Sequence, residues 1–457
     1  MIDLKDKEVC VLGLGVSGFA ACKLLLAQKI NVKISEINDN PNTKDKLKIL
    51  QDKGVKFEIG KHSAEFILSC DLIVVSPGVR FDLPILKKAR QNKIPVISEI
   101  ELAYQFCPSK IIAVTGTNGK TTTVKLISHL LKEKFNVYEG GNLDIPFEVP
   151  FSSFVEKLYG EDIVVLEVSS FQLENILYFE PFVSIMLNIT TDHLNVHKDM
   201  NDYLSSKAKI FSNQKAGDFT VINASDPYLL KMKDIIHSNL CYFSLNKKVP
   251  EGAYINRDEI IFCKDEEIEV ICKKDVFPLL GEHNLENCLA AVVAARILGL
   301  NKFEIEKGLR SFQNIEHRLE EVGEIKGVEF INDSKSTNVA CLEKALLTFK
   351  APLFLILGGI DKGNDYSQIG TLIKGKVKSI FAIGKSKENI AKVFKNIVDV
   401  IIKETLEEAV ECALKNAKSG EKILFSPACA SFDMFKDYKD RGKQFKKIFS
   451  RLKKKYE

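Results

Sequence analysis

The sequence predicts an α/β protein with three domains, and three observations support this fold class. The chain has 457 residues, more than a single hydrophobic core usually supports. Short apolar runs of strand type alternate with segments that carry apolar residues at helical spacing. Polar loops follow several of these strands, as in parallel sheets with crossover helices. We therefore expect domains that span residues 1–98, 99–313 and 314–457.

The composition is typical of a globular protein in a reducing cytoplasm. Hydrophobic residues make up 45% of the chain, and a net charge of +4 gives no footprint for nucleic acid. The 11 cysteines are scattered from Cys10 to Cys429 without a Cys-x-x-Cys pair, so we expect reduced thiols and neither disulfides nor zinc. The N-terminus has no apolar signal core, no segment has the pattern of a membrane span, and the lysine-rich C-terminal end is predicted to be a solvated helix face.

The first domain is predicted to be Rossmann-like. A strand over residues 8–12 leads into Gly-Leu-Gly-Val-Ser-Gly at 13–18, and a helical pattern follows. Glycines at this spacing let the backbone approach a diphosphate, and Glu36 ends the next strand where an acid would hold a ribose hydroxyl. The pattern indicates NAD when taken alone, but the same geometry serves any nucleotide diphosphate. A later strand ends in a Ser-Pro-Gly turn at 76–78, at the end of a strand where α/β folds bind ligands.

The central domain is predicted to be P-loop ATPase-like. An apolar strand over 111–114 enters the loop Thr-Gly-Thr-Asn-Gly-Lys-Thr at 115–121, and a helical pattern follows. The glycines turn backbone N–H groups toward an anion, Lys120 can reach the β- and γ-phosphates, and the Thr121 hydroxyl can bind Mg²⁺. Val114 stands where the standard loop has its first glycine, so this loop is a shorter form.

Acidic and histidine side chains follow the next two strands of the central domain. Glu167 ends a continuous apolar run, and it can either bind Mg²⁺ opposite the phosphate loop or act as a solvated or helix-capping acid. His193 and His197 would form a metal site only if they shared a helix face, which Asn195 between them disfavours. Both interpretations of Glu167 stay open at this point.

The end of the central domain carries short strand patterns and two asparagines. Asn284 and Asn287 share one face near the start of an alanine-rich helix, where they can contact an adenine edge or cap the helix. The strand patterns indicate a small antiparallel meander; they span residues 241–243, 259–262 and 268–271.

The last domain is again predicted to be Rossmann-like. Four strand patterns are each followed by a polar loop; they span residues 328–331, 353–357, 379–383 and 422–425. Loops that follow parallel strands share one edge of the sheet, which should bring four donors together: Lys335, Thr337, Lys362 and Ser431. Converging donors suit an anionic ligand, in particular a dicarboxylate.

Assembled in this order, the motifs resemble those of the Mur ligases of peptidoglycan synthesis. The resemblance covers essentially the whole chain. The features shared across that family are residues 116–122, Glu167, Asp192-His193, residues 281–287 and His317-Arg318. Three further segments resemble the branch of the family that adds D-glutamate: residues 13–18, 332–338 and 426–433.

The resemblance implies an ATP-dependent ligase that forms an amide through an acyl phosphate. The implied substrates are UDP-N-acetylmuramoyl-L-alanine and D-glutamate, in the cytoplasmic synthesis of peptidoglycan precursors. The implied cofactors are ATP and Mg²⁺, with two ions that Mn²⁺ can replace. Small molecules are the only partners implied, without nucleic acid or membrane insertion, and we expect a monomer.

The resemblance also implies roles for individual residues. Catalysis would depend on Lys120, Glu167, His193 and Lys207, and the metal ions would be held by Thr121, Glu167, His193 and a carbamylated Lys207. The residues implied for ATP are Gly116, Thr117, Asn118, Gly119, Lys120, Thr121, Thr122, Asn284, Asn287, Arg318 and Asp333. Those for the UDP substrate are Gly15, Val16, Ser17, Gly18, Ser35, Glu36, Ser76, Pro77, Gly78 and Asn142. Those for D-glutamate are Lys335, Thr337, Lys362, Ser431, Phe432 and Tyr438.

Three alternative functions compete with this interpretation. A folylpolyglutamate-type ligase would use the same mechanism on a folate, but it would normally lack a domain like residues 1–98. An NAD-dependent dehydrogenase with an added domain would also carry the opening glycines. A non-catalytic nucleotide-binding module is disfavoured by the combination of Glu167, His193 and Lys207.

Overall fold

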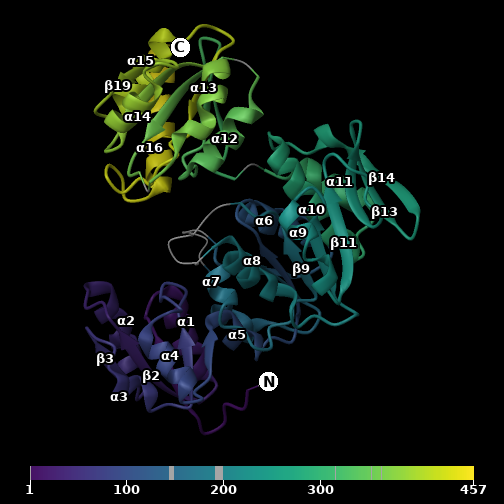
Figure 1. Cartoon of the computed structure of the whole chain (residues 1–457), viewed down its shortest axis with the longest axis vertical. Coiled ribbons are helices and arrows are strands. Elements are labelled where there is room, and N and C mark those ends of the chain that lie inside the picture. The colour runs from purple at the N-terminus through teal and green to yellow at the C-terminus, as the bar shows by residue number, and fades with distance from the viewer. Residues whose placement is uncertain are drawn as a thin grey trace. The chain divides into compact units, whose positions relative to one another are not determined.

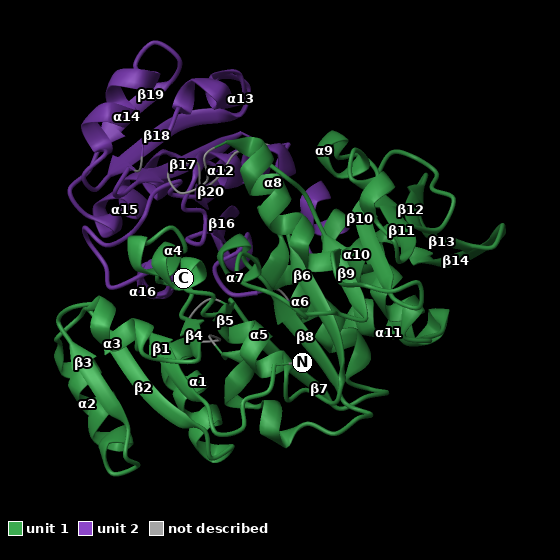
Figure 2. Ribbon diagram, turned by 60° about the horizontal axis from the view of Figure 1, so that its bottom comes forward, with its two compact units in different colours: residues 1–277, 286–312 green, residues 278–285, 313–457 purple. Residues whose placement is uncertain are grey.

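The computed structural model describes six segments of the chain, residues 2–143, 149–190, 199–313, 315–350, 352–361 and 363–456 (Figure 1). Within these residues the strands form three sheets, of five, nine and six strands. The chain divides into two compact units (Figure 2): residues 1–277 with 286–312, and residues 278–285 with 313–457. The first unit contains the five- and nine-stranded sheets and the second contains the six-stranded sheet, so the predicted α/β class is confirmed.

The five-stranded sheet is built from β1 (Glu8–Leu12), α1 (Val16–Ala27), β2 (Asn31–Glu36), α2 (Pro41–Gln51), β3 (Lys56–Ile59), α3 (Ala64–Leu68), β4 (Leu72–Val75), α4 (Pro84–Gln91) and β5 (Val96–Ser98). Its strands are all parallel, in the order β3-β2-β1-β4-β5. Val9 and Val11 of β1 belong to one hydrophobic cluster and Cys10 to another, because successive side chains of a strand point to opposite faces. Strand β3, which has no apolar run, was not predicted.

The nine-stranded sheet is built from α5 (Glu99–Tyr104), β6 (Lys110–Thr115), α6 (Lys120–Leu131), β7 (Val137–Gly141), β8 (Ile163–Glu167), α7 (Ser170–Leu173), β9 (Val183–Met186), α8 (Met200–Ala208), β10 (Phe219–Asn223), α9 (Pro227–Leu230), β11 (Asn239–Ser244), β12 (Gly252–Asn256), β13 (Glu259–Lys264), β14 (Glu267–Lys273), α10 (Glu282–Ile297) and α11 (Lys302–Ser311). The strand order is β14-β13-β12-β11-β10-β9-β6-β8-β7. Pairing is parallel from β7 to β12 and antiparallel from β12 to β14.

The predicted antiparallel meander is wrong for its first strand. Residues 241–243 lie in β11, which pairs in parallel with both β10 and β12. The connection from β10 to β11 contains helix α9, so the chain returns and runs in the same direction. The antiparallel part consists of β12, β13 and β14. Strand β12 was not predicted, because it begins with Gly252, which has no apolar side chain and has a φ of 125°.

The six-stranded sheet is built from β15 (Glu320–Ile325), β16 (Val328–Asn332), α12 (Val339–Thr348), β17 (Leu353–Gly358), α13 (Gly370–Lys376), β18 (Val377–Ile383), α14 (Lys387–Phe394), β19 (Asp399–Ile402), α15 (Leu406–Asn416), β20 (Lys422–Phe425) and α16 (Tyr438–Tyr456). The strand order is β15-β16-β20-β17-β18-β19, and only the β15–β16 pair is antiparallel among these described strands. The four predicted strands are confirmed as β16, β17, β18 and β20.

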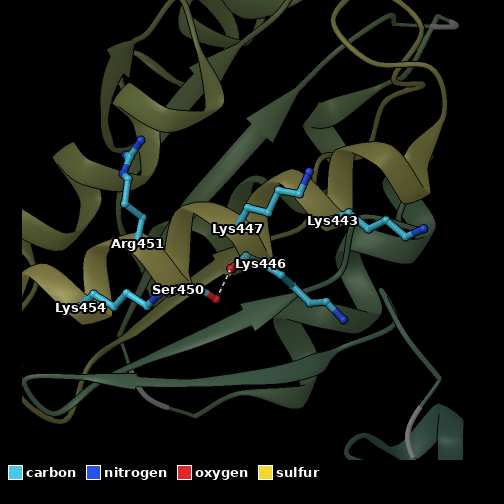
Figure 3. A pocket seen from close by; sticks show the side chains of 6 residues that line it. All are labelled: Lys443, Lys446, Lys447, Ser450, Arg451 and Lys454. Atoms are coloured by element: carbon cyan, nitrogen blue, oxygen red, sulfur yellow. Dashed lines mark hydrogen bonds between the residues drawn. The ribbon is translucent and has the colours of Figure 1, made fainter.

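Helix α16 is amphipathic. Phe445 is fully buried, whereas the opposite side of the helix carries exposed lysines around a surface hollow (Figure 3); they are Lys443, Lys447 and Lys454. Lys446 lies beside them and donates to the carboxylates of Glu316 and Glu320, both at 2.7 Å. The lysine-rich end is therefore a solvated helix face, as predicted. None of the helices in the described residues is long and apolar enough to cross a membrane.

Helix α5 connects the two sheets of the first unit and is fastened by two buried carboxylates. Glu101 accepts hydrogen bonds from the backbone N–H groups of residues 177–179, at 3.0, 3.0 and 2.9 Å. The Oε1 atom of Glu99 accepts from the N–H and the hydroxyl of Ser152, at 2.6 and 2.5 Å. The other oxygen of Glu99, Oε2, is buried without a hydrogen-bond partner. Burial raises the pKa of Glu99 to about 7.

Replacing Glu99 by Gln should remove part of the pH dependence of stability. The pKa of Glu99 is about 7 in the folded chain against 4.5 for the ordinary carboxyl, so the folded state holds this proton more tightly. The resulting stabilisation, about 3 kcal/mol for a shift of this size, is complete below the ordinary pKa and is lost as the pH rises through the folded value. We expect the urea-unfolding midpoint, followed by circular dichroism, to fall more between about pH 5.5 and about pH 8 in the unmodified protein than in Glu99→Gln.

The control is Glu161→Gln, because Glu161 is exposed. It should keep the pH dependence of the unmodified protein. Equal pH dependence in Glu99→Gln and the unmodified protein would contradict the assignment.

Candidate functional site

The predicted phosphate loop joins β6 to α6 and adopts a conformation that requires its glycines. Gly116 has a φ of 146° and Gly119 a φ of 89°, both in the region that favours glycine. A Cβ atom on Gly119 would also collide with Oδ1 of Asn287, which comes from α10. The fold of the first unit therefore packs the side chain of Asn287 directly on the loop.

The segment that follows β9 holds this loop in place. Asn118 and Asn188 exchange two hydrogen bonds: the N–H of Asn118 donates to Oδ1 of Asn188 at 2.9 Å, and Nδ2 of Asn188 donates to the Asn118 carbonyl at 3.1 Å. The Thr117 hydroxyl contacts the hydroxyl of Tyr203 at 3.3 Å. Asn188 was not predicted as a residue of the site, although its polar side chain stands out inside an apolar strand pattern.

Two lysines donate to the same backbone carbonyl of the loop. Nζ of Lys120 lies 3.1 Å from the carbonyl oxygen of Gly116, and Nζ of Lys207, from α8, lies 3.0 Å from the same atom. Lys207 is only 2% exposed, and its Nζ lies 4.8 Å from the ring centroid of Tyr203. Two ammonium groups that converge on one loop create a positive cradle, which suits a polyphosphate.

A hydroxyl and a carboxylate meet beside the loop. The Thr121 hydroxyl, in the first turn of α6, donates to Oε2 of Glu167 at 2.7 Å, and both side chains are buried. Glu167 ends β8 and lies opposite Val114 of β6 in the parallel register, which places its carboxylate at the loop. Paired oxygen donors beside a phosphate loop fit Mg²⁺, which usually takes one or two protein carboxylates and completes its shell with water and phosphate.

Further metal ligands are not gathered among the described residues, where no three His, Cys, Asp or Glu side chains form a metal-binding group. His193, the third metal ligand implied by the sequence, lies outside the described residues. Among the described residues, Thr121 and Glu167 are the two whose oxygens could hold Mg²⁺ at the loop.

Asn142 lies at the same sheet edge, on the side of β7. Its N–H donates to the backbone carbonyl of Glu167 at 2.8 Å, and its side chain is exposed. Gly141 before it has a φ of 92°, and a Cβ atom there would collide with the Glu167 carbonyl. The carboxyl ends of β7, β8 and β6 thus bring Asn142, Glu167 and the phosphate loop together.

The glycine loop lies at the carboxyl edge of the five-stranded sheet. A Cβ atom on Gly18 would collide with the carbonyl of Gly13, so glycine is needed where α1 packs on β1. The Ser76 hydroxyl, which follows β4, donates to the same Gly13 carbonyl at 2.7 Å. The fold therefore brings two predicted groups to one edge: Gly15, Val16, Ser17 and Gly18 from the loop, and Ser76, Pro77 and Gly78 from the turn.

Glu36 and Ser35 reach this edge from the end of β2. Oε2 of Glu36 accepts from the N–H of Leu14 at 2.5 Å, and its Oε1 accepts from the N–H of Asn38 at 2.7 Å, so the carboxylate holds the loop. The hydroxyl of Ser35 lies 2.7 Å from Nδ1 of His62, and burial lowers the pKa of His62, which favours a neutral ring. Sequence reasoning missed His62, because nothing in its local pattern relates it to β2.

In the second unit, Asp333 follows β16 and is buried. It accepts from the Ser426 hydroxyl at 2.7 Å and from the N–H of Leu319 at 3.3 Å. Burial raises the pKa of Asp333 to about 7, against the opposing charge of Arg318. Asn284 also belongs to this unit, where its Nδ2 donates to the backbone carbonyl four residues earlier at 2.7 Å.

A buried arginine joins two of the predicted ligand loops. Arg441 of α16 is 1% exposed; its guanidinium donates to the hydroxyl and carbonyl of Ser334 at 3.0 and 2.7 Å, and to the carbonyl of Cys429 at 3.0 Å. Burial lowers the pKa of Arg441 to about 10. Sequence reasoning missed this residue, although it precedes Phe445 by four residues and so shares the apolar helix face.

The loops after β17 and β20 also lie side by side. Ile360 and Ala430 exchange two backbone hydrogen bonds, at 2.8 and 3.1 Å. Lys362, which the sequence places in the first of these loops, lies outside the described residues.

The remaining predicted ligand residues of the second unit sit on these loops. Nζ of Lys335 lies 4.2 Å from the ring centroid of Tyr438, so the structure brings these two together. Thr337 is half-buried on the same loop as Lys335. Ser431 is buried in the loop after β20, whereas the neighbouring Phe432 is 69% exposed.

Comparison with known proteins identifies three consecutive domain types in the chain. A model of the MurD-like N-terminal domain of Mur ligases matches residues 7–98, the Mur ligase middle domain matches residues 114–295, and the glutamate ligase domain of Mur ligases matches residues 317–429.

Two bacterial relatives match over the full length. Both are named UDP-N-acetylmuramoylalanine--D-glutamate ligase. The protein from Thermoanaerobacter sp. (strain X514) is 40% identical over 456 residues, covering 99% of this chain and 100% of its own. The protein from Koribacter versatilis is 40% identical over 453 residues, covering 99% of each.

Solved structures share the fold at lower identity. The UDP-N-acetylmuramate-alanine ligase MurC from Thermotoga maritima has a TM-score of 0.60 at 19% identity, over 98% of this chain and 100% of its own. The MurF ligase from the same organism, solved in complex with ADP, has a TM-score of 0.58 at 17% identity, over 99% and 96%.

Replacing Gly119 by Ala should disrupt nucleotide binding. The new Cβ would sit at a φ unfavourable for alanine and would displace Asn287 from the loop. We expect the affinity for ATP, measured by calorimetry, to fall about tenfold or more.

The matched control is Gly217→Ala, where a Cβ atom would meet open space. This variant should bind ATP like the unmodified protein. Undiminished binding by Gly119→Ala would exclude the loop as the nucleotide site.

Proposed function

The chain belongs to the Mur ligase family, and from this premise we propose that it joins D-glutamate to UDP-N-acetylmuramoyl-L-alanine at the expense of ATP, in the synthesis of peptidoglycan precursors. The substrates follow from the names of relatives that are 40% identical over 99% of the chain. The structural observation that best supports this reaction type is the Thr121–Glu167 pair, which lies beside a loop on which two lysines converge.

The chemistry requires that the substrate carboxylate be activated. Oxide is a very poor leaving group, so the carboxylate oxygen first attacks the γ-phosphorus of ATP, and ADP leaves. The neutral amine of D-glutamate then attacks the carbonyl carbon of the acyl phosphate; the C–N bond forms, the C–O bond to phosphate breaks, and the nitrogen gives up a proton as phosphate leaves. Lys120 would leave its present loop carbonyls to neutralise the β- and γ-phosphates.

We propose that Thr121 and Glu167 hold Mg²⁺, because their oxygens already lie together at the loop. Mg²⁺ would lower the repulsion between the triphosphate and the attacking carboxylate. The chain's own groups fix the shape of the loop: Asn188 accepts from the N–H groups of Thr117 and Asn118, and Asn287 packs against Gly119.

We further propose that Lys207 is carbamylated in the active enzyme and acts with His193 at a second metal ion. The support is geometric, since Nζ of Lys207 lies 3.0 Å from the Gly116 carbonyl, at the loop proposed to hold the phosphates. A carbamate supplies oxygen, the ligand type that Mg²⁺ and Mn²⁺ prefer.

The other substrates are assigned to the remaining sheet edges. The first domain, residues 1–98, would hold the UDP part through residues 15–18, Ser35, Glu36 and the turn at 76–78, with Asn142 of the central domain, residues 99–313, at the sugar-peptide. Burial of Ser35 against His62 supports a compact base or ribose pocket at that edge.

The third domain, residues 314–457, would hold D-glutamate. Its proposed contacts are Lys335, Thr337, Lys362, Ser431, Phe432 and Tyr438. Arg441 would act as a positioning residue, because it ties together the loops that carry them. Arg318, Asp333 and Asn284 would contact ATP, and the protein would act as a cytoplasmic monomer.

One observation counts against each of the two alternative enzymes. A folylpolyglutamate-type ligase does not explain the match of residues 7–98 to the MurD-like N-terminal domain. A dehydrogenase does not explain the matches of residues 114–295 and 317–429 to the middle and glutamate ligase domains of Mur ligases.

The proposed activity predicts ADP release that requires both UDP-N-acetylmuramoyl-L-alanine and D-glutamate. A coupled ADP assay with a panel of amino acids measures it. Omission of either substrate should abolish turnover, and L-glutamate should not replace D-glutamate. Substantial turnover with L-glutamate or with a folate would contradict the proposal.

Replacing Lys207 by Ala should remove most activity, because the proposed carbamate is lost. Short carboxylic acids added to Lys207→Ala should restore part of the rate by supplying the missing oxygens, as measured in the same ADP assay. Lys209→Ala is the matched control, since Lys209 pairs with Glu174 away from the loop. Absence of rescue across a concentration series would remove the case for carbamylation.

A further inference from the structure

A cavity lies at the amino ends of four parallel strands in the central domain, and we name it the amino-edge cavity. Its volume is about 600 Å³, within the range of about 300–1,000 Å³ that is usual for small-molecule sites. It is lined by residues at the start of β6 and β8, by residues just before β7, β8 and β9, and by the C-terminal end of α10. All of these segments belong to the first unit, so one compact body forms the cavity.

The strand register sets the frame of the amino-edge cavity. Ile163, the first residue of β8, is the register partner of Lys110 in β6 and of Val137 in β7, so one row crosses three strands. Phe182 precedes β9, which pairs with β6 on its other side. A parallel strand rises about 3.3 Å per residue, so the phosphate loop, which begins at Thr115, lies about 16 Å from Lys110 along β6. The cavity is therefore separate from the carboxyl edge that carries the phosphate loop.

The walls of the cavity are apolar and partly aromatic. Phe135 and Phe182 are half-buried, and the ring of Phe182 meets the ring of Phe219 edge to face, with centroids 5.6 Å apart. Ile297 and Leu298, at the end of α10, are half-buried as well. Flat apolar surface that stays accessible inside a cavity favours a ligand with a flat apolar body.

Hydrogen bonds fix the polar side of the cavity. Asp162 is 3% exposed; its Oδ1 accepts from Nδ2 of Asn136 at 2.9 Å, and its Oδ2 accepts from the N–H of Tyr159 at 2.8 Å. The N–H of Ile163 donates to the Asn136 carbonyl at 3.0 Å. The loops before β7 and β8 are therefore held together by the chain's own groups, and the cavity is pre-formed.

The charged side chains that line the cavity leave one net positive charge, because two lysines, Lys110 and Lys134, stand against one carboxylate, Glu161. Nζ of Lys134 donates to the carbonyl of Gly299 at 2.7 Å. Nζ of Lys110 lies 4.2 Å from the ring centroid of Phe182, and no carboxylate among the described residues pairs with it. Lys110 thus places an ammonium group over an aromatic wall, where an anion can reach it.

We propose that the amino-edge cavity binds a small organic anion with a flat apolar body and a single acidic group. The acidic group pairs with Lys110, and the body lies against Phe182, Phe135 and the end of α10. One net positive charge matches one negative charge, and Glu161 repels a ligand with several, such as a nucleoside triphosphate. The proposal is independent of the proposed function, because none of the residues assigned there lines the cavity.

The experiment uses the full chain and the fluorescent probe anilinonaphthalene sulfonate, a flat apolar monoanion that brightens when it leaves water for an apolar site. We expect saturable binding at a single site. Naphthoate should displace the probe, whereas naphthalenemethanol, which has a similar shape without the charge, should displace it about fivefold more weakly. Neither ATP nor UDP should displace it, because the cavity lies away from the sheet edges assigned to them.

Two variants at the cavity should change the affinity for the probe in opposite directions. Lys110→Gln should weaken binding about fivefold, because it removes the ammonium group, and Glu161→Gln should strengthen it, because it removes the opposing carboxylate. Lys326→Gln is the matched control: Nζ of Lys326 lies 4.3 Å from the ring centroid of Tyr456, a similar contact in which neither residue lines the cavity. This control should bind the probe like the unmodified protein.

Several results would overturn the proposed site. Unchanged binding by Lys110→Gln, or equal weakening by Lys326→Gln, would show that the probe binds elsewhere. Weaker binding by Glu161→Gln, or equal displacement by naphthoate and naphthalenemethanol, would remove the argument from charge. Displacement of the probe by ATP or UDP would place it at a substrate site. A protein without ligase activity that binds the probe as expected would contradict only the proposed function.

Discussion

The candidate site depends on the carbonyl oxygen of Gly116, where the ammonium groups of Lys120 and Lys207 meet. An anion that binds at this loop would meet both ammonium groups, and each would attract it. Four elements of the central domain form this arrangement. Strand β6 supplies the carbonyl, α6 and α8 supply the lysines, and β8 supplies Glu167, which reaches the loop through Thr121.

The three sheets share one arrangement of strands and loops. Parallel strands place the loops that follow them side by side, and glycines allow the close approach that this requires. Gly18 permits α1 to pack on the Gly13 carbonyl, and Gly141 permits β7 to pass the carbonyl of Glu167. In the last sheet, the guanidinium of Arg441 joins two loops by hydrogen bonds to Ser334 and Cys429.

Buried polar groups connect these edges to the rest of the first unit. Glu101 and Glu99 fasten α5 to the central sheet, and Lys33 donates to Ser69 at the opposite end of the strands that carry the glycine loop. Glu99 has a raised pKa because it is buried. The raised pKa of Glu99 makes the stability of the first unit depend on pH.

Local sequence determined the α/β class, the strands with continuous apolar runs, and both glycine loops, because periodicity and glycine spacing are properties of neighbouring residues. It also indicated Lys120, Thr121 and Glu167, whereas Lys207 came only from the family resemblance. The tertiary structure decided what depends on distant partners: the parallel pairing of β11, the contact of His62 with Ser35, and the placement of Asn188 and Arg441. These contacts join residues from separate elements, and only the folded chain brings such residues together.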